Sequence, residues 1–269
     1  MTSRTLSVRV VPPRMIGGGA TKLLERNFLV YRRAWMIIFS GFFEPFFYLF
    51  SIGIGLGALV GEVPGPGGVL VPYDVFVAPA LLGSAAMNGA ILESTFNIFF
   101  KLKYGKVYDA VLSTPMRPGD IAVGEITWSL MRGAAYAAAF LVVMSFMGLM
   151  QSPWGIMALP VAILIGFAFA AVGMAATTFM NSWQDFDMIT LVQLPLFLFS
   201  ATFYPLEVYP GAFQVLTRFS PLYHGVELIR GFTTGVLDWS MVGHASFLVV
   251  MGVIGVAIAS RRLERLLLA

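Results

Sequence analysis

The chain contains no cysteine and few charged residues, and both absences narrow its class. Without cysteine, disulfides and thiolate metal sites are excluded. Charged residues make up 12% of the 269 residues, whereas soluble domains usually carry about 25%. A soluble fold of this length would lack the polar side chains needed to cover its surface. Because 58% of the residues are hydrophobic, the composition indicates an integral membrane protein.

Signals for nucleic-acid binding and for a cleavable signal peptide are also missing. The basic residues flank apolar runs and are not interleaved with exposed aromatic residues, so nothing supports binding to nucleic acid. Residues 1–14 carry three arginines, but their short apolar run is ended by Pro12-Pro13, which is not typical of a signal peptide. We therefore expect the first long apolar segment to be retained.

Six apolar segments are long enough to cross a bilayer, which needs about 20 helical residues because backbone groups in lipid must be satisfied within the segment. They lie at about 35–60, 74–100, 123–149, 154–180, 186–205 and 243–260. We predict an all-α membrane protein with six transmembrane helices. In this organisation, residues 1–34 form a cytoplasmic tail with an interface helix, and residues 35–269 form one six-span domain.

The connections between these segments differ in charge. The first, 61–72, has no Lys or Arg, whereas the second, 101–120, carries four: Lys101, Lys103, Lys106 and Arg117. If both termini lie on one side, that side receives 14 of the 17 basic residues. Since cytoplasmic loops are enriched in Lys and Arg, we predict that both termini face the cytoplasm.

Residues 17–33, which precede the first span, have the pattern of an amphipathic helix. Four apolar residues can share one face, and most of the charged residues lie elsewhere: Leu23, Leu24, Phe28 and Leu29 against Lys22, Glu25, Arg26, Arg32 and Arg33. This pattern predicts a helix that lies in the cytoplasmic membrane interface. A flexible basic flank is the alternative.

The second connection contains a short helical segment, 106–113, which is ended by Thr114-Pro115 and Pro118-Gly119. A rigid helix between two spans is suited to docking a partner. A simple connection between the spans fits the same composition, so both interpretations stay open at this point.

The region 204–235 is too interrupted to span the membrane. Pro210 and Pro221 each suit the first turn of a short helix, and Ser220 is a good N-cap before Pro221. The two helices would carry three charged residues, Arg218, Glu227 and Arg230. We predict a helical hairpin that re-enters the outer leaflet before the last span, with an exposed loop as the alternative.

Ionisable residues at membrane depth are functional hypotheses by default, and four occur here: Glu44, Glu93, Glu125 and Arg132. Glu93 lies about 12 Å from Lys101 along its helix, at about 1.5 Å per residue, and Arg132 lies at a similar depth. This match suggests a Glu93–Arg132 pair. Alternatively, both side chains extend to the cytoplasmic surface.

Other apparent motifs carry no chemistry. The glycines at 53–57 lie inside a span with no preceding strand, so they are expected to permit close helix packing instead of nucleotide binding. Residues 17–22 lack the spacing of a phosphate-binding loop. His224 and His244 look isolated, with no carboxylate at ligand spacing, so no metal site is predicted.

The order of these segments resembles the permease of ABC-2-type exporters. Glu44-Pro45 with the glycines at 53–57 resembles the first span of that family. Its coupling segment is matched by Leu112-Ser113-Thr114-Pro115-Met116-Arg117, with Asp120-Ile121 and Gly124-Glu125. Its C-terminal signature is matched by the pattern from Pro221 through His224 to Glu227 and Arg230, although Tyr209 before Pro210 departs from it.

Within the family, the chain is most similar to nodulation lipo-oligosaccharide exporter permeases and next to daunorubicin-type drug-efflux permeases. The resemblance implies that this chain is not an enzyme and binds no cofactor, because a separate ATP-binding cassette subunit, expected in two copies, binds ATP and Mg. It implies a second permease chain, identical or homologous, membrane lipids as neighbours, and the bacterial plasma (inner) membrane as location. It also implies that force reaches the spans through the interface helix and a coupling surface: Lys106, Tyr108, Asp109, Leu112, Thr114, Pro115 and Arg117.

The leading functional hypothesis is therefore an exporter permease for an amphipathic lipid-linked, glycolipid or drug-like substrate. Substrate contact is expected on the first, second and fifth spans, at Phe42, Phe43, Phe46, Phe96 and Phe197. An ion-coupled secondary transporter is the alternative, but its paired half-repeats and buried ion sites are not evident. A membrane-embedded enzyme would need clustered His or Asp at one membrane face.

Overall fold

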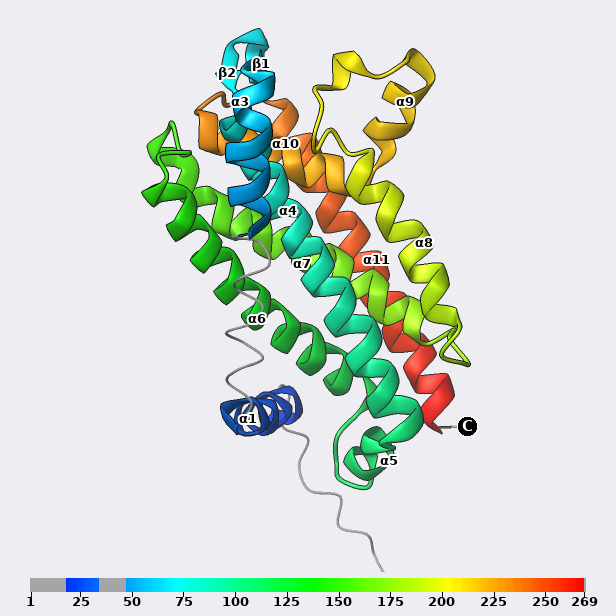
Figure 1. Ribbon diagram of the computed structural model, residues 1–269. Coiled ribbons are helices and arrows are strands. Elements are labelled where there is room, and N and C mark those ends of the chain that lie inside the picture. The colour runs from blue at the N-terminus through cyan, green and yellow to red at the C-terminus, as the bar shows by residue number, and fades with distance from the viewer. Residues whose placement is uncertain (1–17, 34–46, 269) are drawn as a thin grey trace, which may run out of the picture.

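A computed structural model describes residues 18–33 and 47–268 (Figure 1). The first part of the predicted span 35–60 lies outside the described residues, as do Glu44, Phe42, Phe43 and Phe46. For Arg32 and Arg33 only the helical backbone is described.

The described chain is almost entirely helical. The long helices are α4 (Tyr73–Leu92), α6 (Pro118–Phe146), α7 (Ala158–Thr177) and α11 (Ser240–Leu268). α4 continues through two π-helical segments, η3 (Glu93–Asn97) and η4 (Phe100–Tyr104). The remaining α-helices are α1 (Gly18–Arg33), α3 (Gly57–Val60), α5 (Val107–Leu112), α8 (Asp185–Leu198), α9 (Gly211–Phe219) and α10 (Pro221–Thr234).

Short elements join these helices. The π-helical segment η1 (Ser51–Leu56) leads into α3, and a small antiparallel hairpin of β1 (Glu62–Pro64) and β2 (Leu70–Pro72) follows, with Val63 opposite Val71. Three 3₁₀ turns complete the chain: η2 (Pro66–Gly68) at the hairpin tip, η5 (Pro153–Met157) before α7, and η6 (Leu206–Val208) before α9.

Four of the described helices are long and apolar enough to cross a membrane: Tyr73–Tyr104, Pro118–Phe146, Pro153–Thr177 and Ser240–Leu266. They correspond to four of the predicted spans. The helix Phe47–Val60 is shorter and borders the part of the chain that is not described. The predicted span 186–205 extends too far, because α8 has 14 residues and ends at Leu198, three residues after an internal proline, Pro195.

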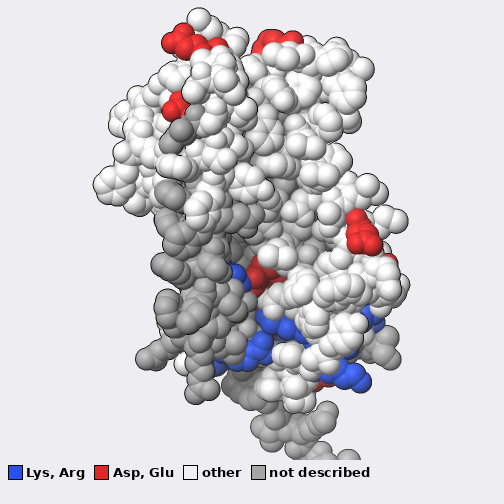
Figure 2. Space-filling model, in the orientation of Figure 1, with Lys and Arg blue, Asp and Glu red and all other residues white. Residues whose placement is uncertain are grey.

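The molecule has two different ends (Figures 1 and 2). α1, α5 and the end of α11 lie at one end, where Lys and Arg side chains gather on the face shown. The β-hairpin and α9 lie at the opposite end, where that face carries Asp and Glu. We call these the basic end and the acidic end. The separation matches the charge asymmetry of the sequence.

α7 forms the centre of the bundle and packs against α4, α6 and α11. Its contact with α11 is close because glycine allows the backbones to approach. A Cβ atom placed on Gly255 would lie 2.8 Å from the Ala171 carbonyl carbon. α11 therefore cannot carry a side chain at this position without a shift of the two helices.

The region 204–235 forms two helices, as predicted; α10 starts where predicted, and only the start of α9 differs. Pro221 is the first residue of α10, whereas Pro210 is the N-cap residue of α9 and precedes its first turn. Ser220 occupies the N-cap position of α10 without capping it. Its hydroxyl instead lies 2.5 Å from the Ser200 hydroxyl, which ties the start of α10 to the segment after α8.

Candidate functional site

A cavity of about 690 Å³ lies among α4, α6 and α8. This volume is within the range of about 300–1,000 Å³ typical of small-molecule sites. The cavity follows α4 from Leu81 to Thr95, a length of about 21 Å at about 1.5 Å per residue. It therefore covers a large part of the depth of a bilayer core, about 30 Å.

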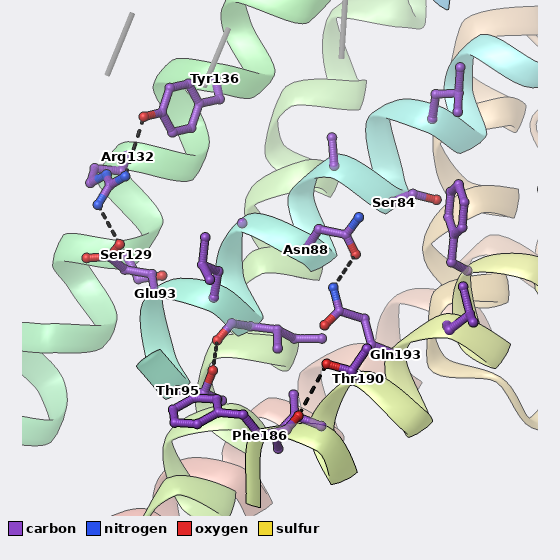
Figure 3. Close-up of a pocket in the computed structure, with 18 of the residues that line it drawn as sticks. Ser84, Asn88, Glu93, Thr95, Ser129, Arg132, Tyr136, Phe186, Thr190 and Gln193 are labelled. Carbon is purple, nitrogen blue, oxygen red and sulfur yellow. Dashed lines mark hydrogen bonds and ion pairs between the residues drawn. The ribbon is translucent and has the colours of Figure 1, made fainter. Parts of the chain in front are cut away.

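Polar side chains from three helices face this cavity (Figure 3). They are Ser84, Asn88, Glu93 and Thr95 of α4 and its extension, Ser129, Arg132 and Tyr136 of α6, and Thr190 and Gln193 of α8. Apolar residues, among them Leu81, Ile189 and Phe197, line the rest. The cavity thus combines hydrogen-bonding groups with apolar walls at membrane depth.

An amide pair crosses the cavity between α4 and α8. The Gln193 amide nitrogen donates to the Asn88 amide oxygen at 2.8 Å. A primary amide has two donors and an acceptor with two lone pairs, so this single bond uses only part of the pair's capacity. The pair can therefore also bind the hydroxyl or carbonyl groups of a ligand.

An ion pair joins α4 to α6 at the edge of the same cavity. The Arg132 guanidinium is bonded to the Glu93 carboxylate, and Arg132 lies 3.4 Å from the Tyr136 hydroxyl. Asn97 donates to the other oxygen of Glu93 at 2.7 Å. The pair suggested by matched depth is therefore confirmed. Pairing removes the cost of an isolated charge at membrane depth and leaves a polar wall in the cavity.

α8 is held at the cavity by few contacts. None of its residues, all of which are described, is buried. Its links to the rest of the described chain include the amide pair and aromatic contacts at its two ends, such as Phe197 with Phe203. α8 is therefore one wall of the cavity and contributes no buried residue to the core.

A second polar cluster lies at the basic end, around Glu125 of α6. Glu125 is 3% exposed, and its Oε2 atom accepts hydrogen bonds from Lys101 Nζ at 2.7 Å and from Asn27 Nδ2 at 3.4 Å. α1 also packs against α6 here, since Leu23 lies directly over Gly124. One carboxylate thus joins α1, the end of α4 and α6.

The coupling segment reaches the same cluster through Tyr108 of α5. This side chain is 1% exposed, and burial raises the pKa of its hydroxyl well above the ordinary value, with the negative charge of Glu125 as the next cause. Leu112 is half-buried. Of the predicted coupling surface, Tyr108 therefore lies against the cluster around Glu125, and Leu112 packs against the hydrophobic core.

The other residues of the predicted coupling surface are exposed. Lys106 has a positive φ of 44° and marks the turn into α5. Asp109, Thr114, Pro115 and Arg117 face outward, and the Arg117 backbone N–H donates to the Asp120 carboxylate at 3.0 Å at the start of α6. The coupling segment is thus held by buried Tyr108 on one side and exposed to a partner on the other.

In α1, burial follows the predicted apolar face only in part. Leu23 and Asn27 are buried, and an exposed ion pair joins Lys22 to Glu25 at 2.9 Å. Arg26 lies 3.3 Å from the Asn27 side-chain oxygen. Phe28 and Leu29 are exposed, which suits a helix that lies against lipid.

At the acidic end, Arg230 of α10 is buried and fully engaged. It donates to the Phe76 carbonyl at 3.3 Å, the Ala201 carbonyl at 2.9 Å and the Glu227 carboxylate at 2.7 Å. Its guanidinium also lies 3.8 Å from the centre of the Phe76 ring. Arg230 therefore fixes α10 to α4 and to the turn after α8, where Ala201 has a φ of 53°.

The interpretation of His224 and His244 as isolated is wrong. Their Nδ1 atoms lie 2.6 Å apart, which links α10 to α11, and His224 stacks on Phe247 with ring centres 4.1 Å apart. Twenty residues separate them in sequence, so their spacing gave no signal of the contact. Among the described residues, no group of three or more His, Asp or Glu is placed to hold a metal ion.

The amide pair was missed by the sequence reasoning. Asn88 and Gln193 are 105 residues apart, and each is one polar residue in an otherwise apolar run. Polar side chains in such runs often hydrogen-bond between helices. This signal was present, but it does not reveal the partner.

The family model for "ABC-2 type transporter" matches residues 21–233. The chain is 34% identical to "Nodulation protein J" of Rhizobium leguminosarum bv. trifolii over 91% of its own length and 92% of the relative. It is 31% identical to "Nodulation protein J" of Sinorhizobium fredii (strain NBRC 101917 / NGR234), with 91% and 92% covered. It is 32% identical to the protein of that name in Rhizobium meliloti (strain 1021), with 78% and 79% covered.

Proposed function

The chain belongs to the ABC-2 type transporter family, and we propose that it is the permease subunit of an ATP-driven exporter for an amphipathic substrate. The family and the apolar helices make it a multi-pass protein of the bacterial inner membrane. The observation that carries the proposal is the cavity among α4, α6 and α8. Its polar groups suit the head of an amphipathic molecule, and its apolar walls suit the tail.

The membrane topology follows from the two ends. We place the basic end in the cytoplasm, because Lys and Arg are enriched in cytoplasmic loops. The helix Phe47–Val60 and α8 then complete six crossings together with the four long helices. α9 and α10 re-enter the membrane from the outside, held there by Arg230.

The coupling surface is the outward side of α5 together with α1. An ATP-binding cassette subunit, in two copies, docks there, and ATP and Mg bind to that subunit. Movement of α5 reaches α4, α6 and α1 together, because Tyr108 is buried beside Glu125 and Glu125 binds Lys101 and Asn27. A second permease chain completes the transporter, and the substrate leaves between the two.

Transport in inverted membrane vesicles tests the function directly. The chain would be co-expressed with its ATP-binding partner, and uptake of daunorubicin and of a fluorescent short-chain glycolipid into the vesicles would be followed. We expect ATP-dependent uptake of at least one probe, abolished when the partner's phosphate-binding lysine is replaced. If affinity purification recovers no ATPase and neither probe accumulates, the exporter model is wrong.

The absence of cysteine makes the topology equally testable. Single cysteines would be introduced as Ser113→Cys at the basic end and Val69→Cys in the β-hairpin, both at exposed positions. A membrane-impermeant maleimide added to intact cells should label only Val69→Cys, and in inverted vesicles only Ser113→Cys. The opposite pattern would reverse the proposed orientation.

A further inference from the structure

Six aromatic residues join the end of α4 to the start of α8. We call them the aromatic floor: Phe96, Phe99, Phe100, Tyr104, Trp183 and Phe186. Across the two helices, ring centres lie 5.3 Å apart for Phe96–Trp183 and Phe99–Phe186, and 5.4 Å apart for Phe100–Trp183. These are edge-to-face contacts, the geometry that aromatic pairs prefer.

The aromatic floor lies at one end of the cavity. Phe186 lines the cavity, and Figure 3 shows it beside Thr95, beyond the Asn88–Gln193 pair. Thr95, in the η3 extension of α4, is the last residue that lines the cavity before the chain continues to Lys101. The floor therefore lies between the cavity and the basic end.

Aromatic residues also gather at membrane interfaces as simple anchors, but an anchor role does not account for this arrangement. Phe99 is buried, and Phe186 is half-buried and lines the cavity, whereas Phe96, Phe100, Tyr104 and Trp183 are 38–63% exposed. Trp183, just before α8, and Phe186 of α8 each contact two rings of the α4 extension. The rings are thus packed against each other across the gap between two helices.

The two segments that carry the floor differ: the α4 extension is π-helical, and α8 has no buried residue. Phe96 lies in the π-helical segment η3, and Phe100 and Tyr104 lie in η4. π-Helical turns inside α-helices are rare and frequently occur at functional sites. On the other side, α8 has no buried residue. The contact between them can therefore separate without disturbing the core around α7.

We propose that the aromatic floor is the gate between the cavity and the basic end, and that it opens when Trp183 and Phe186 separate from the α4 extension. With the function proposed above, on which the direction of transport rests, this gate is where the substrate enters from the cytoplasmic side. The contacts seen here then separate the cavity from the basic end between transport cycles.

A cysteine reporter in the cavity tests the gate without substrate or ATP. Ala85 lines the cavity and is half-buried, so Ala85→Cys is a conservative reporter in a chain with no other cysteine. The full-length protein in inverted vesicles would be treated with the impermeant reagent MTSET. Ser113→Cys, exposed at the basic end, sets the rate for an open position.

We expect Ala85→Cys to react slowly in the parent and at least tenfold faster when Phe186→Ala or Trp183→Ala is added. Phe179→Ala is the matched control, since Phe179 packs on Arg262 near the same end, outside the floor, and should leave the rate unchanged. If Phe186→Ala does not fold, Trp183→Leu, at a position 46% exposed, serves in its place. Reaction of the parent as fast as Ser113→Cys, or unchanged rates in the floor variants, would overturn the gate and leave the exporter function to its own test.

Discussion

α7 and α8 are both apolar helices, yet they are built into the molecule in opposite ways. Thirteen of the twenty residues of α7 are buried, whereas none of the fourteen residues of α8 is. α7 packs against α4, α6 and α11, and we call this group of helices the packed side. α8 lines the cavity without joining the core, and we call it the cavity side. The sequence pattern predicted a span from both helices. An apolar run therefore does not show whether a membrane segment supports the core or lines a passage.

The largest loss of stability is expected when Glu125, the carboxylate buried among α1, the α4 extension and α6, is replaced. Glu125→Ala leaves Lys101 without its partner at a site where the lysine side chain is only 14% exposed. Because removing one partner of a buried ion pair costs about 3–5 kcal/mol, we expect the free energy of unfolding to fall by about 3 kcal/mol. Denaturation by SDS in mixed micelles, followed by tryptophan fluorescence, measures this change.

Two variants show whether the ion pair is the cause. Glu264→Ala removes an exposed carboxylate of α11 and should leave the midpoint unchanged. The double variant Lys101→Met, Glu125→Leu replaces both charges by apolar groups and should recover most of the loss. A double variant as unstable as Glu125→Ala would mean that the pair contributes little.

The next effect is expected where α7 meets α11. Gly255→Ala places a methyl group 2.8 Å from the Ala171 backbone, and overpacking of this kind costs about 1–3 kcal/mol. Gly243→Ala is a matched control on the same helix, because a Cβ atom there meets nothing within 4 Å, and it should be neutral or slightly stabilising. Thermal aggregation in detergent compares the two. Equal midpoints would show that the packed side is less tightly packed than it appears.

The cavity side should respond in the opposite manner, with a small change in stability and a large change in transport. Gln193→Leu removes the amide pair with Asn88, and a single hydrogen bond contributes about 1 kcal/mol or less. Because the polar head of the substrate loses its binding group, we expect uptake to fall about tenfold, equivalent to about 1.4 kcal/mol.

Leu191→Ala is the control for this prediction, at an exposed position of α8 that does not line the cavity. It should leave uptake unchanged. If Gln193→Leu lowers stability as much as Gly255→Ala does, α8 is part of the core after all. Unchanged uptake would remove the amide pair from the transport path.

Much of this architecture was predictable because its signals are local. Four spans, the charge asymmetry of the connections and the two short helices at 204–235 follow from runs of residues within one segment. The Glu93–Arg132 pair was also predictable, because depth along a helix can be counted from its charged end. In each case the constraint (segment length, loop charge or depth along a helix) depends on residues close together in the sequence.

The features that sequence reasoning missed or misread depend on how helices are placed next to each other. Nothing in the sequence near Asn88 indicates that Gln193 is its partner, and His224 meets His244 only through the crossing of α10 and α11. Ser220 is a good N-cap by residue type, but its hydroxyl bonds to Ser200 instead. Tertiary contacts that compete with local preferences cannot be read from one chain.

The smallest loss of stability is expected at Asp185, which begins α8 and lies just before the predicted span 186–205. Its carboxylate accepts the backbone N–H groups of Asn181 at 2.7 Å and Ser182 at 3.1 Å, and these bonds lower its pKa. A lowered pKa in the folded state stabilises the fold above the ordinary value of 3.8, and this contribution is lost as the pH falls through the lowered value.

Asp185→Ala should therefore be slightly less stable than the parent at neutral pH, and the two should converge as the pH is lowered through about 4. Met188→Ala, at an exposed apolar position of the same helix, is the control and should differ from the parent by the same amount at every pH. The measurement is the difference in thermal midpoint between parent and variant across pH, which cancels the titration of other groups. Because this capped turn is the entry to a helix with no buried residue, a large effect at Asp185 would mean that the turn before α8, together with the aromatic floor, is what fixes α8 in place.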